Sequence, residues 1–397
     1  MASPTSPAND AWPRHAAAAV RDLRGGMRLA MDGVRLGIDR VEAAHDRMAR
    51  IDPPVRGTRI LRPTTGWGAA FYHGLRGTAG LAGGAMDLVL ASVQASLADP
   101  PRERAPAEPS PTREAVLAVL NALAGEHLHR TDNPLAIATR LQRPAGTATS
   151  RVLVLAHDFG LDDLHWNRHG HGQARALAEA LKTTPVHAQY NTGRPVAALG
   201  RELAAELQAL LSHWPEPLQD VVLLGHGMGG LVLRSALHHA GRTGMTWPAR
   251  VGHAVFLGTP HGGAEPQQVL AWLARLGAGR AAALLPLGRL ARHRSAGMDD
   301  VIHGNVLAVD SRTGTSAPAD SAAGLPPTLR TYAVAGAIGD GSSDGLVSVA
   351  SALGREPGPH GTLPLADEHR WVAQGVDHMG LLSSDAVFRT MQQWLSA

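Results

Sequence analysis

The feature that most constrains the fold is a continuous apolar segment that runs into a cluster of glycines. Residues 221–224 are all valine or leucine, which is typical of a buried strand. Glycines then occupy four of the six positions 225–230, and a helical pattern begins at Leu231. Glycine accepts positive φ angles and allows two backbone segments to approach closely. The segment therefore predicts a strand, a sharp turn and a helix in the interior of an α/β domain.

Other strand-like segments alternate with helical ones from residue 151 onward. This alternation predicts an α/β fold with a doubly wound, mostly parallel sheet over residues 150–397. A weakly patterned stretch at 264–328 is a candidate lid insertion. The expected strands are 152–156, 186–190, 221–224, 251–257 and 329–334, and the expected helices include 173–181, 196–213 and 385–395.

Residues 1–130 differ from this pattern and predict an N-terminal helical extension. Apolar residues recur there at three- and four-residue steps, and a stretch rich in proline and charge near 99–112 predicts a linker. The apolar segment 77–98 contains Asp87 and is too short for a convincing transmembrane span. The N-terminal helices are expected to pack on the main domain, with peripheral contact to a membrane or a protein as the alternative.

Composition excludes several classes of function. The 397 residues include no cysteine, which excludes disulfides, thiolate metal sites and a thiol nucleophile. Basic residues exceed acidic ones by only 37 to 34, and no basic stripe interleaved with aromatic residues is present, so we expect no nucleic-acid partner. The first residues lack the apolar region of a secretory signal. We expect a cytoplasmic protein, with membrane association through the N-terminal helices as an option.

The glycine turn matches a dinucleotide-binding pattern in its letters. Gly225, Gly227 and Gly230 give G-x-G-x-x-G between a strand and a helix, where backbone N–H groups can face a pyrophosphate. That pattern also requires a carboxylate about 20 residues later to bind the ribose. No aspartate or glutamate occurs between Val221 and Ala264. Nucleotide binding is therefore the weaker interpretation.

The same turn fits the nucleophile elbow of a hydrolase, with glycine in place of serine. In the pattern G-x-S-x-G, Gly225 and Gly229 are the flanking residues and Gly227 occupies the nucleophile position. The nucleophile of such an elbow has a positive φ, which glycine adopts without strain. Asp344 and His378 follow in the chain order nucleophile, acid, base, and they are the candidate acid and base.

A second segment supplies the expected oxyanion hole. His157 opens the loop after the first core strand, and Asp158 and Phe159 follow it. A backbone N–H of this loop and the N–H of Met228 are the candidates for binding a developing oxyanion.

Together these motifs resemble the α/β-hydrolase superfamily, and within it the bacterial lipase/esterase-like group related to the GPI inositol-deacylases. That group has G-H-S-M-G-G at the elbow and a following strand that ends in L-G-T-P-H-x-G. The corresponding segments here are 225–230 and 257–263, and residues 344–347 and His378 resemble the acid loop and the base. The resemblance covers about residues 150–395. It implies serine hydrolysis of a small ester or lipid-like molecule without a cofactor.

Two positions depart from that group. Gly227 lacks the nucleophilic oxygen, and Asp158 places a carboxylate where the group has a glycine in its oxyanion loop. Loss of the serine lowers the rate by many orders of magnitude, and a nearby anion raises the barrier further. The chain is therefore expected to be inactive or strongly impaired, apart from a slow route in which His378 activates a water in the space left by Gly227. The alternative is a ligand-binding or scaffolding pseudohydrolase.

Five further histidines have simple interpretations. His165, His169 and His171 have the spacing of a metal cluster, but the chain contains 21 histidines, so they favour a polar loop. We expect no metal site. His226 and His261 are expected beside the cleft, His261 as a structural turn residue.

Two aspartates compete with the candidate acid. Asp340 lies four residues before Asp344, in a Gly-Asp-Gly setting that predicts a simple turn. Asp377 precedes His378 and is expected to anchor its loop. Asp344 is preferred because Gly-Leu-Val follows it.

Overall fold

The computed structural model describes residues 12–50, a discontinuous set between 70 and 91, and residues 111–396 except 145, 171–172, 279–294, 309–324, 327 and 359–360. The chain forms two compact units. The smaller unit is drawn from Met1–Pro109, Leu128–Ala136 and Ala282–Leu290, and the larger one from Ser110–His127, Ile137–Ala281 and Ala291–Ala397.

A long helix, α1 (Trp12–Arg50), dominates the described part of the smaller unit. Its Arg24 and Arg28 both form ion pairs with Asp87, each with an N–O distance of 2.7 Å. Hydrogen bonds from Arg24 and Arg28 hold the pKa of Asp87 well below its usual range, although burial opposes ionisation. Among the described residues, no helix is both long enough and apolar enough to cross a membrane.

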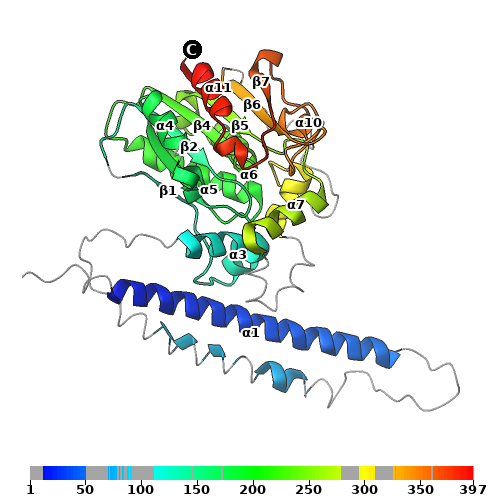
Figure 1. Cartoon of the computed structure of the whole chain (residues 1–397). Coiled ribbons are helices and arrows are strands. Elements are labelled where there is room, and N and C mark those ends of the chain that lie inside the picture. Colours follow the sequence, from blue (N-terminus) through cyan, green and yellow to red (C-terminus); the bar gives the residue numbers. More distant parts are fainter. Residues whose placement is uncertain are drawn as a thin grey trace, which may run out of the picture. The chain divides into compact units, whose positions relative to one another are not determined.

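A seven-stranded sheet forms the centre of the larger unit, with the order β1-β3-β2-β4-β5-β6-β7. The pair β1–β3 is antiparallel, and all other neighbours are parallel. Figure 1 shows these strands with helices on both sides, which confirms the predicted doubly wound α/β fold. The strands are β1 (Arg140–Gln142), β2 (Arg151–Ala156), β3 (Thr184–Gln189), β4 (Asp220–His226), β5 (Val251–Leu257), β6 (Arg330–Ala337) and β7 (Arg370–Gln374).

Alternate residues of the central strands β2, β4, β5 and β6 point to opposite faces of the sheet and enter two separate hydrophobic cores. Val154 of β2 belongs to the core that includes residues of α5 (Val196–Ser212), α6 (Met228–Arg242) and α7 (Pro266–Leu273). Its neighbour Leu155 belongs to the other core. That second core is completed by residues of α4 (Gln173–Ala180) and α11 (Asp385–Ser396).

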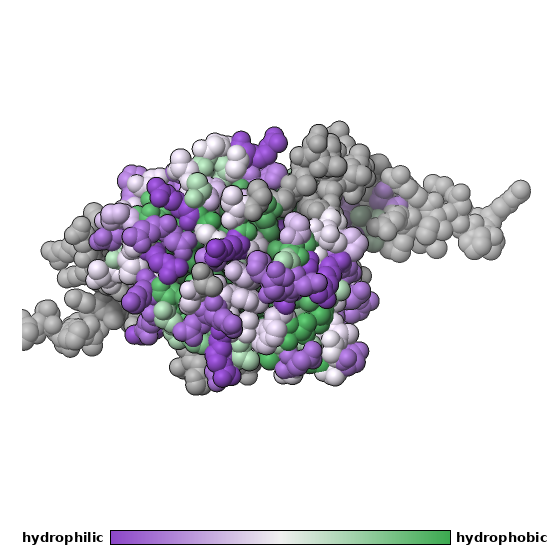
Figure 2. Space-filling model, turned by 90° about the horizontal axis from the view of Figure 1, so that it is seen from above, coloured by the Kyte–Doolittle hydropathy of each residue, from purple (hydrophilic) through white to green (hydrophobic). Residues whose placement is uncertain are grey.

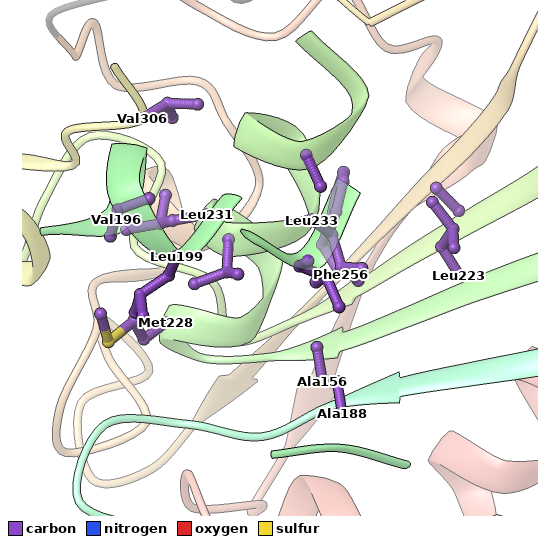
Figure 3. Packing of buried hydrophobic residues seen from close by; sticks show 14 of the residues in the cluster. Ala156, Ala188, Val196, Leu199, Leu223, Met228, Leu231, Leu233, Phe256 and Val306 are labelled. Carbon is purple, nitrogen blue, oxygen red and sulfur yellow. The ribbon is translucent and has the colours of Figure 1, made fainter. Parts of the chain in front are cut away.

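The first core lies directly under the glycine turn. Figure 3 shows Met228 and Leu231 of α6 close to Leu199 of α5, and all three are fully buried. Complete burial of such a side chain contributes about 1.5–3 kcal/mol to the free energy of unfolding. The packing of α6 against α5 therefore fixes the position of the glycine turn.

The surface of the molecule has a mixed character. On the face in Figure 2, hydrophilic side chains are interspersed with smaller hydrophobic areas.

The sequence pattern does not predict two of the strands, β1 and β7. Both are edge strands, and both begin with an arginine, Arg140 or Arg370. A short edge strand is half exposed and lacks the continuous apolar run that identifies β2 or β4. Its existence depends on pairing with a neighbour that is distant in sequence, so the local pattern is uninformative.

The candidate lid, residues 264–328, lies only partly within the described residues. Its described part contains α7, a π-helical turn (Ala274–Ala278) and α9 (Ala296–His303). Asp300 of α9 accepts a hydrogen bond from the backbone N–H of Val196 (2.7 Å), the first residue of α5. This bond satisfies a helix N–H that has no partner within its own helix.

Replacement of Asp300 by asparagine is expected to change stability in a pH-dependent way. Burial raises the pKa of Asp300 from 3.8 to about 6, against the opposing hydrogen bonds from Val196 and Asn305. Because the pKa is raised on folding, protonation of Asp300 adds to the free energy of unfolding at low pH. This added stability is lost as pH rises through about 6. The free energy of unfolding measured in urea should therefore rise for Asp300→Asn relative to the unmodified chain, by up to roughly 3 kcal/mol between pH 4 and pH 7. A difference between Asp300→Asn and the unmodified chain that stays constant from pH 4 to pH 7 would contradict this assignment.

Candidate active site

The glycine turn has the backbone form of a nucleophile elbow. Gly227 has φ 51° and ψ −123°, and α6 begins at the next residue. The N–H of Gly227 donates to the carbonyl of Leu257 at the end of β5 (2.9 Å). A Cβ added at Gly225 would lie 2.6 Å from the backbone nitrogen of Gly230, so the strand and the helix require glycine where they cross.

Gly229 and Gly241 of α6 offer a matched test of this close approach. A Cβ at Gly229 would overlap the carbonyl of Ala156 and lie 2.8 Å from the carbonyl oxygen of His157, whereas a Cβ at Gly241 would meet nothing within 4 Å. Gly229→Ala should therefore lower the free energy of unfolding by about 1–3 kcal/mol. Gly241→Ala should raise it by up to about 1 kcal/mol, because alanine is the better helix former. Urea denaturation of both variants measures the two signs.

The candidate acid and base are bonded to each other. His378 Nδ1 lies 2.7 Å from Asp344 Oδ2, and both residues are buried. The other oxygen of Asp344 accepts hydrogen bonds from the backbone N–H groups of Leu346 (2.9 Å) and Val347 (2.7 Å). The Gly-Leu-Val segment after Asp344 therefore fixes the orientation of the carboxylate, and the carboxylate fixes the imidazole.

Asp158 occupies the place where a nucleophile would act. Its Oδ1 accepts a hydrogen bond from the N–H of Met228 (2.5 Å), the expected oxyanion donor, and its Oδ2 lies 3.1 Å from His378 Nε2. A Cβ added at Gly227 would lie within 2.7 Å of all three carboxylate atoms of Asp158. The space next to Gly227, which a water would have to occupy for the slow route through His378, is therefore filled by a carboxylate.

The three side chains form a buried chain of alternating charge, Asp158, His378 and Asp344. Burial opposes the charge of His378, but Asp344 and Asp158 outweigh this effect and raise its pKa to about 10. Burial likewise opposes ionisation of Asp158, yet the hydrogen bond and charge of His378 leave its pKa below the usual value. At neutral pH the imidazole therefore carries a proton on each nitrogen and donates to a carboxylate on each side.

His226 packs against this chain from the last position of β4. Its ring centroid lies 4.5 Å from that of His378, and its Nε2 lies 3.0 Å from the backbone carbonyl oxygen of His378. Burial, followed by repulsion from His378, lowers the pKa of His226 to about 4, so this imidazole is neutral. Nε2 therefore carries the proton and donates to the carbonyl. Nδ1 has no hydrogen-bond partner among the described residues and is buried.

The predicted oxyanion loop is fixed by an aromatic residue that the sequence pattern does not identify. His157 stacks on Tyr190 with ring centroids 4.1 Å apart, and the Tyr190 hydroxyl donates to the carbonyl of His157. Burial lowers the pKa of His157, which stays neutral and donates from Nδ1 to the carbonyl of Asp158 (3.0 Å). Tyr190 immediately follows β3. The carboxyl end of a parallel strand is where site residues are expected, and this position is the signal that points to it.

Helix α7 of the candidate lid also contacts the site. The indole nitrogen of Trp272 donates to the carbonyl of Phe159 (3.0 Å), and the Trp272 ring meets the His378 ring edge to face at 5.1 Å. Phe159 itself is buried in the first core. Nothing in the sequence around Trp272 indicates this contact, because it joins the insertion to a loop 113 residues earlier.

The other polar candidates lie apart from this chain of charges. His261 is buried beside Arg234, 3.2 Å from its guanidinium, and burial followed by the charge of Arg234 lowers its pKa well below the usual value. His165 contacts Asp162 at 2.5 Å. The side chain of His169 and the whole of His171 lie outside the described residues.

The two rival aspartates have local structural partners. Asp340 accepts a hydrogen bond from the N–H of Ser342 (3.0 Å) on the exposed loop after β6. Asp377 accepts one from the N–H of Gly380 (2.6 Å) and so anchors the loop that carries His378. Neither forms the hydrogen bond to His378 Nδ1 that Asp344 makes.

The geometry does not suit a dinucleotide. The first N–H of α6, that of Met228, faces the carboxylate of Asp158. A pyrophosphate at this helix end would meet a negative charge at the point where it needs donors. The glycines 225, 227 and 230 are explained by close packing and by the positive φ of the turn alone.

No protein-family model matches the chain, and a search of curated protein sequences finds no match. Among solved structures the chain is similar to the mature lipase BlEst2 of Bacillus licheniformis (17% identity, 65% of this chain and 98% of that chain, TM-score 0.43). It is also similar to a lipase-esterase related protein from Clostridium acetobutylicum ATCC 824 (11%, 64% and 98%, TM-score 0.38) and to a thermophilic esterase from Thermogutta terrifontis (16%, 66% and 93%, TM-score 0.36). These identities and scores are too low to carry an argument about function.

Proposed function

We propose that this chain is a lipase/esterase-type hydrolase whose serine chemistry has been lost, so that it hydrolyses esters extremely slowly or not at all. The observation that carries the proposal is the double engagement of Asp158. One carboxylate oxygen accepts the Met228 N–H, and the other faces His378 Nε2. In a serine hydrolase these two groups serve the oxyanion and the nucleophile. Here the side chain of Asp158 occupies both groups, the Met228 N–H and His378 Nε2.

Three physical reasons support the absence of turnover. Gly227 provides no oxygen that could form an acyl intermediate. The carboxylate of Asp158 lies where negative charge would have to develop on the substrate, and this raises the barrier. His378, with its pKa raised to about 10, holds the proton that a general base would have to release at neutral pH. Each reason is sufficient to slow the reaction.

A direct assay tests the proposal. The full chain is incubated with nitrophenyl esters of short and medium acyl length, beside the variant His378→Ala. We expect both proteins to release nitrophenol at the rate of buffer. Turnover by the unmodified chain that disappears in His378→Ala would overturn the proposal, because it would show that the base still works with another nucleophile.

A further inference from the structure

Three side chains at this site form a cluster with the composition of a metal centre. One carboxylate oxygen of Asp158 and one imidazole nitrogen each of His226 and His378 all lie within 4.8 Å of one another. None of the three residues is more than 2% exposed. Among the described residues, this is the group of histidines and carboxylates close enough together to share one ion.

We propose that Asp158, His226 and His378 form a binding site for one divalent transition-metal ion, with zinc as the best match. Two imidazoles and one carboxylate are ligands that zinc and related first-row ions accept, whereas magnesium and calcium prefer oxygen ligands. Three protein ligands leave a fourth position of a tetrahedral zinc ion open. On binding, the ion takes the place of the proton on His378 Nε2, and that proton leaves to solvent.

The free lone pair of His226 is the first observation that favours an ion. Its Nε2 is used by the carbonyl of His378, while its Nδ1 is buried without a partner among the described residues. A buried nitrogen without a hydrogen bond costs free energy, and a metal ion is a group that satisfies it. The carbonyl also fixes the tautomer, because metal-binding histidines generally donate their second N–H to such an acceptor.

The imidazole of His378 likewise has one nitrogen bonded to an acceptor and the other directed at the proposed ion site. His378 donates from Nδ1 to Asp344 at 2.7 Å, which leaves Nε2 facing Asp158. A carboxylate behind a histidine orients the ring and raises its basicity toward an ion. In this proposal Asp344 positions His378 and does not touch the metal.

One ligand–ligand distance and the balance of charge agree with this assignment. His378 Nε2 and Asp158 Oδ2 are 3.1 Å apart. Two ligands about 2.1 Å from a tetrahedral zinc ion are separated by about 3.4 Å, so this pair needs almost no movement. Asp158 and Asp344 bring two buried carboxylates, and a single protonated His378 balances only one of them. A divalent cation between two neutral imidazoles balances both.

The proposal differs from the expectation, drawn from the sequence, that the chain has no metal site. It also does not depend on the loss of ester hydrolysis, because its readout is bound metal. Ester turnover by the unmodified chain would leave the metal measurement unaffected. Absence of bound metal would likewise leave the result of the ester assay unaffected.

Metal content of the full chain gives the test. Because the site is buried, zinc is offered both to the folded protein and during refolding from urea, after removal of metals with a chelator. We expect one zinc ion per chain after gel filtration, a higher Tm with zinc and no change in Tm with magnesium. Cobalt in place of zinc should give the visible absorption of a four- or five-coordinate ion with nitrogen and oxygen ligands.

Variants distinguish this site from zinc held by other histidines. Asp158→Asn and His226→Gln should each lose the stoichiometric ion, and Asp344→Asn should weaken binding by about 10- to 100-fold. The control His187→Gln, at another buried histidine on β3, should bind like the unmodified chain. Equal loss in the control, or full binding by Asp158→Asn, would overturn the proposal. If the variants fold poorly, a cobalt spectrum of the unmodified chain identical to that of cobalt in buffer has the same consequence.

Discussion

The double variant Asp158→Gly with Gly227→Ser is expected to hydrolyse short acyl esters, with kcat up to about 10⁶-fold above that of the unmodified chain. The introduced serine would stand at a turn whose φ of 51° already matches a nucleophile elbow. Removal of the Asp158 carboxylate frees the Met228 N–H for the oxyanion and His378 Nε2 for the new hydroxyl. The hydrogen bond from His378 to Asp344 is unchanged, so all the parts of a triad are then present.

Each single variant is expected to remain inactive, for a different reason. In Gly227→Ser the new Cβ meets the Asp158 carboxylate, so the serine is displaced and the fold is destabilised. In Asp158→Gly the site is open but contains no nucleophile. Initial rates on nitrophenyl esters compare the four proteins, with Asp158→Gly/Gly227→Ala as the control for packing.

Two outcomes would contradict this account. Activity of Gly227→Ser equal to that of the double variant would show that Asp158 does not obstruct the elbow. A folded but inactive double variant would argue against a hydrolase architecture. Addition of His378→Ala to the double variant must abolish the gain, because a serine without its base is not activated.

The replacement of His378 by glutamine is expected to lower the free energy of unfolding by about 3–5 kcal/mol. His378 is the cation between Asp158 and Asp344, and all three side chains are buried. Its removal leaves two carboxylates facing a neutral amide without compensating charge. The combined variant Asp158→Asn/His378→Gln should recover part of the loss, since one of the two carboxylates is then neutral. Urea unfolding in the presence of a chelator measures both values.

The pH dependence of this loss identifies its cause. The pKa of His378 rises from 6.5 to about 10 on folding, so its contribution is complete below pH 6.5 and is lost as pH rises through about 10. The difference in Tm between the unmodified chain and His378→Gln should therefore narrow between pH 7 and pH 10. A difference that stays constant over this range would mean that the loss comes from packing and not from charge.

The strands of the core were predictable because their signal is local. Residues 152–156 and 221–224 are continuous apolar runs, and a strand that is buried on both faces requires such a run wherever it lies in the chain. The edge strands β1 and β7 were not predictable, since each is defined by pairing across the sheet. The weak pattern of residues 264–328 likewise does not predict the described helices of the insertion.

The candidate acid, base and elbow could be proposed from the sequence, because each is marked by glycine or by chain order. The sequence also places the Asp158 carboxylate in the oxyanion loop, but the contacts that Asp158 and Trp272 make with His378 could not be proposed from it. Asp158 meets Met228 across 70 residues and His378 across 220 residues of chain, and Trp272 meets the same imidazole from the insertion. No local pattern encodes such contacts, since they arise only when the carboxyl ends of the parallel strands meet at one edge of the sheet.

The sequence by itself determined the backbone of the glycine turn, because glycine adopts its positive φ without strain and allows its close packing, and it determined that residue 227 carries no oxygen. The tertiary structure decided what takes the place of that oxygen. Parallel pairing of β2 with β4 places Ala156 beside Gly225, and so brings the following loop to the elbow. The Asp158 carboxylate then lies between the Met228 N–H and His378. A charge so deeply buried must find donors, and the two that Asp158 finds are those that a serine hydrolase would keep for its substrate.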